Sequence, residues 1–258
     1  MPTSARLALF ALLVSSLASS QVTVTHQEGS IHGFLVLRSE AGEILATGDV
    51  NQTLKAGRVT ARTTFRFKDG SFREETAVYT EKSVFRLIRD HLIEKGPSFP
   101  HPIDMHIDAL SGNVSVRSLD GKQEAKTEHI AIPANLVNGI LTTVIKDLGI
   151  HAATTLAMIV ATPKPRLVKL EVSYVGEEPF WVGRTELKAR HFTVKIELKG
   201  LAGIVAPVIG KEPPDLNIWI YNDSVPAFLR SQAPLYEGGP TWTIELASPV
   251  WTEPKGSR

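Results

Sequence analysis

The sequence predicts a mainly β fold, in which a curved antiparallel sheet or an open barrel is wrapped around one main helix. Three observations predict it. Apolar and polar residues alternate along several stretches, Asp-Gly pairs separate some of these stretches, and one stretch repeats its apolar residues at helical spacing. Alternation with period two places successive side chains on opposite faces of a sheet, whereas steps of three and four residues place them on one face of a helix.

The clearest predicted strand covers residues 191–199. The even-numbered residues from Phe192 to Leu198 are apolar there, and the residues between them are threonine, lysine or glutamate. The same alternation occurs in residues 168–174 and 242–246. Each of these strands is therefore expected to have one buried face and one solvated face.

Asp-Gly pairs at residues 69–70 and 120–121 predict two hairpins, because this dipeptide favours the positive φ of a two-residue type I′ turn. At the first turn, a two-residue loop would pair Phe67 with Phe72 on the apolar face. The opposite, solvated face would then carry four charged residues: Arg62, Arg66, Arg73 and Glu75.

The predicted helix covers residues 134–148, between Pro133 and a glycine stop at Gly149. Its apolar positions recur at steps of three and four residues. They are Leu136, Ile140, Leu141, Val144, Ile145 and Leu148. Because this apolar stripe covers much of the circumference, we expect the helix to lie against the concave side of the sheet. The residues expected to line a ligand site there are Leu136, Ile140, Val144 and Trp219.

Residues 1–20 are expected to form a signal peptide. Arg6 precedes an apolar run at residues 7–14, which is far shorter than the roughly 20 residues that span a bilayer. Small residues at positions 18–20 predict cleavage before Gln21. The sequence therefore predicts a periplasmic or secreted protein with no integral membrane span after cleavage.

The rest of the chain, residues 21–258, is expected to form a single antiparallel β domain. No repeat, low-complexity tract or long linker interrupts it. Two halves that meet near residues 163–165, where two prolines occur, are the alternative.

The charge balance narrows the possible partners, and the lack of cysteine limits what can stabilise the fold. The chain has 28 basic and 27 acidic residues and no cysteine. One arginine lies in the predicted signal peptide, so the mature chain is formally neutral. Its basic residues alternate with acidic ones along the strands, and this argues against nucleic acid as a partner. Without disulfides, stability must come from the core.

The densest polar segment covers residues 89–108. It contains four candidate site residues: His91, His101, Asp104 and His106. On a strand, Asp104 and His106 share a face, and a histidine beside carboxylates can act as a general base or a metal ligand. A strand offers a ligand only at every second residue, however, and the compact spacing of an HExxH motif is missing. We therefore expect a solvated strand face, with Met105 and Ile107 packed inward, and no catalytic residue, metal or cofactor.

Two segments rich in glycine and proline lack a catalytic or nucleotide-binding motif. Ser98 follows a Gly-Pro pair, but Pro100 and Pro102 exclude the helix that must follow the nucleophile of an α/β-hydrolase. In residues 200–214, a Gly-Lys pair is followed by Glu-Pro-Pro instead of the serine or threonine of a phosphate-binding loop. This segment is expected to be a long apolar connection.

Two stretches in the C-terminal third resemble a known family. Residues 183–194 read GRTELKARHFTV, and residues 214–229 read PDLNIWIYNDSVPAFL. They resemble the end of an uncharacterised family of exported bacterial β proteins, which is similar to the periplasmic lipoprotein-carrier fold, a curved antiparallel sheet around a helix. The resemblance implies this fold and no catalytic residue. The fold markers that it implies are Ala189, His191, Trp219, Asp223 and Pro226. Segments 89–108 and 200–214 are longer here than in the carriers. The resemblance therefore does not imply that this chain binds a ligand in the way that the carriers do.

Three functions stay open on the sequence. The favoured one is a non-catalytic binding or carrier protein for a hydrophobic ligand, a lipid or an acylated partner protein, held between sheet and helix. The second is an envelope structural or interaction protein with a packed core. The third is a hydrolase or metal-dependent enzyme that uses the polar cluster. A cavity beneath the helix would favour the first function, and convergence of His91, His101 and Asp104 would favour the third.

Overall fold

The computed structural model describes residues 21–121, 124–150, 153–182, 184–197, 213–221 and 225–247. The predicted signal peptide, residues 200–212 of the long apolar connection, Leu198 and Asp223 lie outside these residues.

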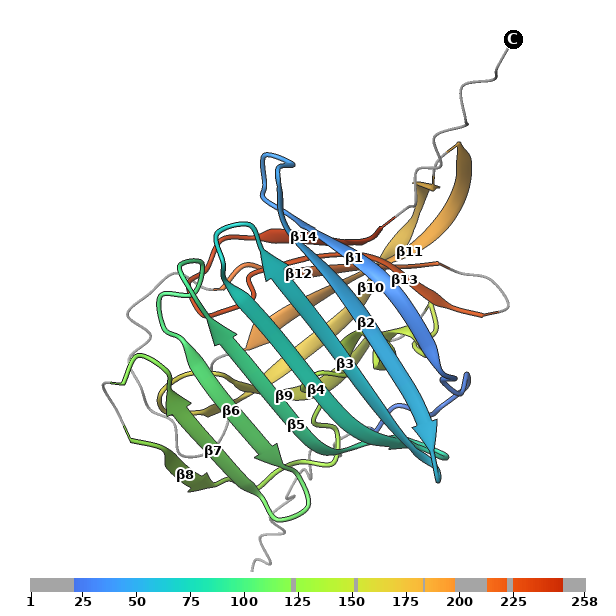
Figure 1. The fold of residues 1–258 in the computed structure, drawn as a ribbon. Coiled ribbons are helices and arrows are strands. Elements are labelled where there is room, and N and C mark those ends of the chain that lie inside the picture. Colours follow the sequence, from blue (N-terminus) through green and yellow to red (C-terminus); the bar gives the residue numbers. More distant parts are fainter. Residues whose placement is uncertain are drawn as a thin grey trace, which may run out of the picture.

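Fourteen strands and one short helix make up the described part of the chain (Figure 1). The first eight strands are β1 (Ile31–Arg38), β2 (Ile44–Lys55), β3 (Arg58–Phe67), β4 (Phe72–Glu81), β5 (Phe85–Lys95), β6 (Ile103–Asp108), β7 (Asn113–Ser118) and β8 (Lys126–His129). After the helix α1 (Leu141–Lys146) come β9 (Ala153–Val160), β10 (Arg166–Val182), β11 (Thr185–Glu197), β12 (Leu216–Tyr221), β13 (Ala227–Ala233) and β14 (Trp242–Leu246).

These strands form a single antiparallel sheet that folds back on itself. Each strand pairs with its neighbour in sequence from β1 to β8 and again from β9 to β14, and β1 pairs with β14 to join the two series. The sheet ends at β8 and β9, which do not pair with each other, so the barrel stays open. In Figure 1 the β1–β8 series forms one layer and the β9–β14 series lies behind it. The predicted curved antiparallel sheet or open barrel is confirmed.

The strands predicted from alternation are present with the expected buried faces. The segment predicted at residues 191–199 belongs to β11, in which Phe192 and Val194 are fully buried. Residues 168–174 belong to the longer β10, and residues 242–246 form β14. Local alternation was therefore sufficient to find these elements and their inward faces.

The first predicted hairpin exists, but its register was wrong by one residue. The backbone N–H of Phe67 donates to the carbonyl of Ser71 (2.9 Å), so the loop has three residues and not two. Its last residue, Gly70, has φ +86°, as is usual where a three-residue hairpin loop ends in a left-handed residue. Arg66 therefore pairs with Phe72, and Phe65 pairs with Arg73. Because side chains alternate along a strand, this shift moves Arg73 and Glu75 from the solvated face to the inner face.

The second predicted hairpin joins β7 and β8. Gly121 has a positive φ of +75°, but the predicted two-residue loop was wrong, because β7 ends at Ser118 and β8 begins only at Lys126. Val116 pairs with Lys126, and Asn113 pairs with His129. Strand β8 is a short edge strand, and its four residues are mostly exposed.

The predicted helix was too long, because only residues Leu141–Lys146 of the segment 134–148 are helical. Gly139 adopts φ +66°, a conformation that ends a right-handed helix. A side chain at this position would also collide with the core, since its Cβ would lie 2.6 Å from Oδ1 of Asp90. The chain before Gly139 is extended enough for Leu136 to form a parallel bridge with Ala157 of β9.

Two asparagines attach this segment to the open edge of β9. The side-chain amide of Asn138 donates to the carbonyl of Ile159 and accepts from its backbone N–H, both at 2.8 Å. The side chain of Asn135 donates to the carbonyl of Thr155 (2.7 Å). These contacts satisfy backbone groups that an uncovered edge strand would offer to another chain.

A buried arginine holds the other end of the helix. The guanidinium of Arg190 on β11 donates to the carbonyls of Leu148 (3.0 Å) and Lys146 (3.3 Å). The last carbonyls of a helix have no partner within the helix, and a cation there also interacts favourably with the helix dipole. The short helix is therefore fixed at its C-terminus to the sheet that surrounds it.

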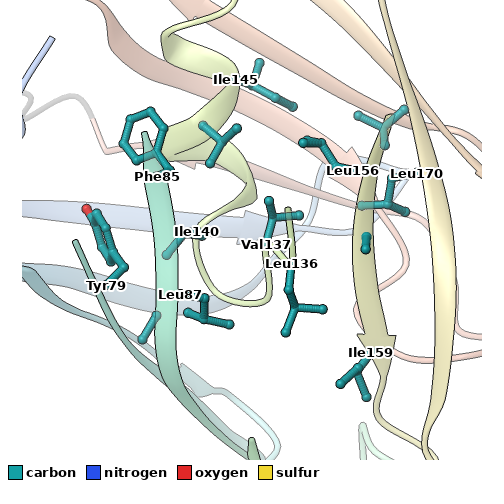
Figure 2. Close-up of a cluster of buried hydrophobic side chains, with 14 of the residues drawn as sticks. Tyr79, Phe85, Leu87, Leu136, Val137, Ile140, Ile145, Leu156, Ile159 and Leu170 are labelled. Atoms are coloured by element: carbon teal, nitrogen blue, oxygen red, sulfur yellow. The ribbon is translucent and has the colours of Figure 1, made fainter. Parts of the chain in front are cut away.

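The main core lies between the two layers of strands, and the segment around α1 fills its centre. Figure 2 shows Ile140, Val137 and Leu136 between Leu87 of β5 on one side and Leu156 and Leu170 of β9 and β10 on the other. All of these side chains belong to one cluster of buried residues that spans both layers. The helical segment does cover the concave face of the sheet, as the sequence predicted.

Candidate functional site

The four residues predicted to line a ligand site do not surround a common space. Leu136, Ile140 and Val144 are buried in the main core, with 3%, 1% and 1% exposure. Trp219 lies on β12 between Ile218 and Ile220; both isoleucines belong to the main core, whereas Trp219 belongs to a separate cluster on the opposite face of the sheet. None of the four lines either of the two hollows found among the described residues at the surface of strands β5–β8.

Trp219 and His191 form a closed network on that opposite face. Their rings stack, with centroids 4.4 Å apart. The Glu178 carboxylate accepts a hydrogen bond from Nε1 of Trp219 (2.8 Å) and lies 2.8 Å from Nδ1 of His191, whose Nε2 is 2.9 Å from Oδ1 of Asn217. Both ring nitrogens of His191 therefore have a partner. The family resemblance implied a role as fold markers for both residues, and that role stays a prediction.

The larger hollow, which we call the end groove, lies at one end of the open barrel and has a volume of about 550 Å³. Strands β5, β6, β7 and β8 contribute residues to it, and so do the segments that follow β9 and β13. Its apolar lining consists of Pro102, Ile103, Val116, Ala161, Pro163 and Tyr236. Its charged lining consists of Glu94, Asp120, Glu124, Glu237 and Lys126. The two halves of the sheet thus share one amphipathic groove.

A buried charge cluster lies behind the end groove. Nε of Arg73 donates to Oε1 of Glu94 and its Nη2 donates to Oε2 of Glu75, both at 2.9 Å. Burial raises the pKa of Glu94, and the nearby Arg73 only partly offsets this effect. Burial of Arg73 favours its neutral form, but the two carboxylates outweigh burial and raise its pKa. Arg73 therefore stays charged and fixes the orientation of Glu94, which lines the groove.

Asp90 adds a third carboxyl group on the inner face. It is 2% exposed, and neither of its oxygens has a hydrogen-bond partner among the described residues. Burial, with a smaller contribution from Glu75, raises its pKa well above the ordinary value, while Arg73 acts in the opposite direction. A carboxyl group in such a place is most stable when it is protonated and neutral.

The polar cluster predicted at residues 89–108 is brought together only in part. On the outer face of the sheet, Nε2 of His91 and Nε2 of His106 lie 3.0 and 3.1 Å from the same oxygen, Oδ1 of Asp104. Arg117 of β7 donates to the other oxygen, Oδ2 (2.5 Å). His101 does not join them, because it lines the end groove. Met105 and Ile107 pack into the core, as predicted.

The charges of this cluster are set by its contacts. Burial alone would raise the pKa of Asp104, but hydrogen bonds from Arg117 and His91 outweigh it, and the pKa lies below the ordinary value. Burial and the neighbouring His91 lower the pKa of His106, although Asp104 acts in the opposite direction. Asp104 is therefore an anion and His106 is neutral around neutral pH.

Comparisons with known proteins add a distant structural likeness. No family model matches the chain, and no curated protein matches its sequence. Among solved structures, the chain is similar to a β-barrel-like protein of the domain of unknown function DUF1849 from Brucella abortus. The two share 9% sequence identity with a TM-score of 0.49, over 86% of this chain and 98% of the other. This neighbour is a β protein of unknown function, and no residue role is transferred from it.

Sequence reasoning missed the inner charges and the end groove. Arg73 and Glu75 were assigned to solvent because the hairpin register was off by one residue. Asp90 and Glu94 lie on β5 two residues before and two residues after the buried Leu92, and this alternation was the available signal. The groove carried no such signal, since its residues come from segments far apart in the chain.

Within the described residues, the single helix is far too short to be a membrane-spanning helix.

Proposed function

We propose that this protein is an exported, non-catalytic binding protein that holds its ligand in the end groove. The observation that carries the proposal is the groove itself. Its volume of about 550 Å³ falls within the range of small-molecule sites, and it combines an apolar lining with a few charged groups. The space between sheet and helix, where the sequence suggested a ligand, is occupied by Leu136, Ile140 and Val144.

The lining of the groove indicates what kind of ligand fits. Six apolar residues offer a surface for a hydrophobic body, while four carboxylates face a single lysine, Lys126. Arg73 neutralises part of this charge from behind, through Glu94, and Arg166 pairs with Glu237 (2.5 Å). The remaining bias favours a ligand with a positively charged or hydrogen-bond-donating head over one with a carboxylate head. An amphiphilic ligand or an acylated partner protein with basic residues beside the acyl chain satisfies both conditions.

A second function is favoured by the filled core. A carrier of the lipoprotein type would hold acyl chains between its sheet and its helix, and here that region is packed with aliphatic side chains. A structural or interaction protein of the cell envelope needs no such space. The end groove is what favours a ligand-binding role over this alternative.

Two fluorescent probes of equal chain length test the proposal: a dansyl-labelled long-chain amine and a dansyl-labelled fatty acid. Ser118 lines the groove, so Ser118→Trp should fill it. Ser115 lies on the same strand but on the outer face, opposite His106, and Ser115→Trp is the matched control. We expect the amine to bind more tightly than the acid to the wild type and to the control, and to lose its binding to Ser118→Trp.

Other outcomes would change the proposal in distinct ways. Tighter binding of the fatty acid would contradict the inferred head group. If neither probe binds, or if Ser118→Trp binds both as the wild type does, the end groove is not a ligand site. The structural or interaction function would then replace the binding function.

A further inference from the structure

We propose that His91, Asp104 and His106 form a binding site for a divalent transition-metal ion of the zinc type on the outer face of the sheet. This site is independent of the end groove. Its three residues come from two neighbouring strands, β5 and β6, in which His91 pairs directly with His106. Asp104 is two residues before His106 and therefore points to the same face.

The distances between the donor atoms are close to those that one ion requires. A nitrogen or oxygen ligand lies about 2.0 to 2.1 Å from zinc, so two ligands of a tetrahedral site are about 3.3 Å apart. Oδ1 of Asp104 is 3.0 Å from Nε2 of His91 and 3.1 Å from Nε2 of His106. All three donor atoms lie within 4.8 Å of one another. The set is thus already close enough to be bridged by a single ion.

Rigid elements hold these side chains. The inward neighbours Leu92, Met105 and Ile107 are buried in the main core, which fixes the two strands that carry the three residues. The two imidazole rings are stacked, with centroids 3.7 Å apart and an angle of 15° between their planes. Their nitrogen lone pairs must converge on a bound ion, so metal binding should unstack the rings without moving the strands.

Arg117 prepares the carboxylate for this role. It holds Oδ2 of Asp104, which leaves Oδ1 as the atom that faces both histidines. Hydrogen bonds to the distal atom of a ligating group commonly orient that group in metal sites.

The site is partly open to solvent. The side chains of His91 and His106 are 35% and 57% exposed, whereas that of Asp104 is 10% exposed. Three protein ligands leave at least one position of a four-coordinate ion for water or for a donor group of another molecule. Two imidazoles and one carboxylate favour ions such as Zn²⁺, Ni²⁺ or Cu²⁺ over Mg²⁺ or Ca²⁺, which prefer oxygen ligands.

Metal titration of the untagged full chain tests this site. After treatment with a chelator, the protein is titrated with Zn²⁺ by calorimetry, and with Co²⁺ while the visible absorption of the bound ion is recorded. We expect saturable binding of one ion per chain. His91→Ala, His106→Ala and Asp104→Asn should each weaken Zn²⁺ binding by at least about tenfold and change the Co²⁺ spectrum.

His101→Ala and His129→Ala are the matched controls, because both replace a neighbouring exposed histidine outside the cluster. They should bind Zn²⁺ as the wild type does. Circular dichroism should show that all five variants are folded, since the four replaced histidines are half-buried or exposed and Asp104→Asn keeps nearly the same side-chain shape. The proposal is overturned if the wild type binds no ion with saturation, or if the three cluster variants bind it as tightly as the controls.

Discussion

The carboxyl group of Asp90 lies inside the sheet, beside Gly139, and neither of its oxygens has a hydrogen-bond partner among the described residues. Protonation removes most of the cost of burial, and this is why its pKa is raised. The absence of a side chain at Gly139 is part of the same arrangement, because a Cβ there would lie 2.6 Å from Oδ1 of Asp90. At the scale of single residues, this position couples the stability of the fold to pH.

Asp90→Asn should therefore stabilise the protein more at neutral pH than in acid. The stabilisation from protonated Asp90 is complete below the pKa of the unfolded chain and is lost as the pH rises towards the raised folded pKa. Within that window the native state holds one extra proton, so its stability falls with pH. The folding equilibrium constant of the variant, relative to that of the wild type, should grow by up to about tenfold per pH unit.

Urea denaturation at about pH 5 and about pH 7 measures this difference. The control is Glu186→Gln, which removes an exposed carboxylate from β11. Its stability should follow that of the wild type at both pH values. Equal effects of Asp90→Asn at the two pH values would show that Asp90 is not protonated in the folded state.

At the scale of elements, the segment of residues 133–148 consists of a part that covers a strand edge and a short helix, and both parts pack into the same core. Its first part uses Asn135 and Asn138 to cover the edge of β9, and its second part forms the short helix. The apolar residues of both parts enter the same core. The helical spacing in the sequence therefore predicted the buried face correctly, but it did not reveal that Gly139 interrupts the helix.

Ile140→Ala and Val144→Ala test how tightly this segment is packed. Both residues are 1% exposed, so the truncation of Ile140 should cost about 2 to 5 kcal/mol of unfolding free energy, with a smaller loss for Val144. Ile150→Ala is the control, because Ile150 follows the helix and is 45% exposed. Its effect should stay within about 0.5 kcal/mol. A loss of similar size in all three variants, measured by denaturant titration, would contradict the packed core.

At the scale of the whole molecule, one core connects the two series of strands. The cluster contains Met105 and Ile107 from β6 as well as Leu170 and Val172 from β10. Each series alone would expose its apolar face, at a cost of about 25 cal/mol for each Å² left in water. The two series should therefore fold and unfold together, as expected for the single domain predicted from residues 21–258.

Calorimetry should then record one unfolding transition, with equal calorimetric and van't Hoff enthalpies. Ile107→Ala and Leu170→Ala, placed in opposite series, should both lower the temperature of that same transition. Two separate transitions, each shifted by only one of the variants, would instead indicate two halves that unfold independently.

Much of the architecture followed from local patterns in the sequence. The alternation around Phe192 and around Met105 defined strands and their inward faces, because a strand's side chains alternate wherever it is placed. The same local rule failed at residues 67–72, where one additional loop residue reversed the faces. This error mattered most at the candidate site. The wrong register placed Arg73 on the solvated face, whereas Arg73 is buried beside the end groove.

The sequence by itself determined that this is an antiparallel β protein around an apolar helical segment, because those features depend on periodicity within a few residues. Only the tertiary structure decided that β1 pairs with β14, that the space beneath the helix is filled, and that the end groove joins distant segments. The tertiary structure also decided that His91 on β5 pairs with His106 on the neighbouring strand β6. The physical reason is that register, packing and cross-strand contacts depend on residues far apart in the chain, on which local spacing carries no information.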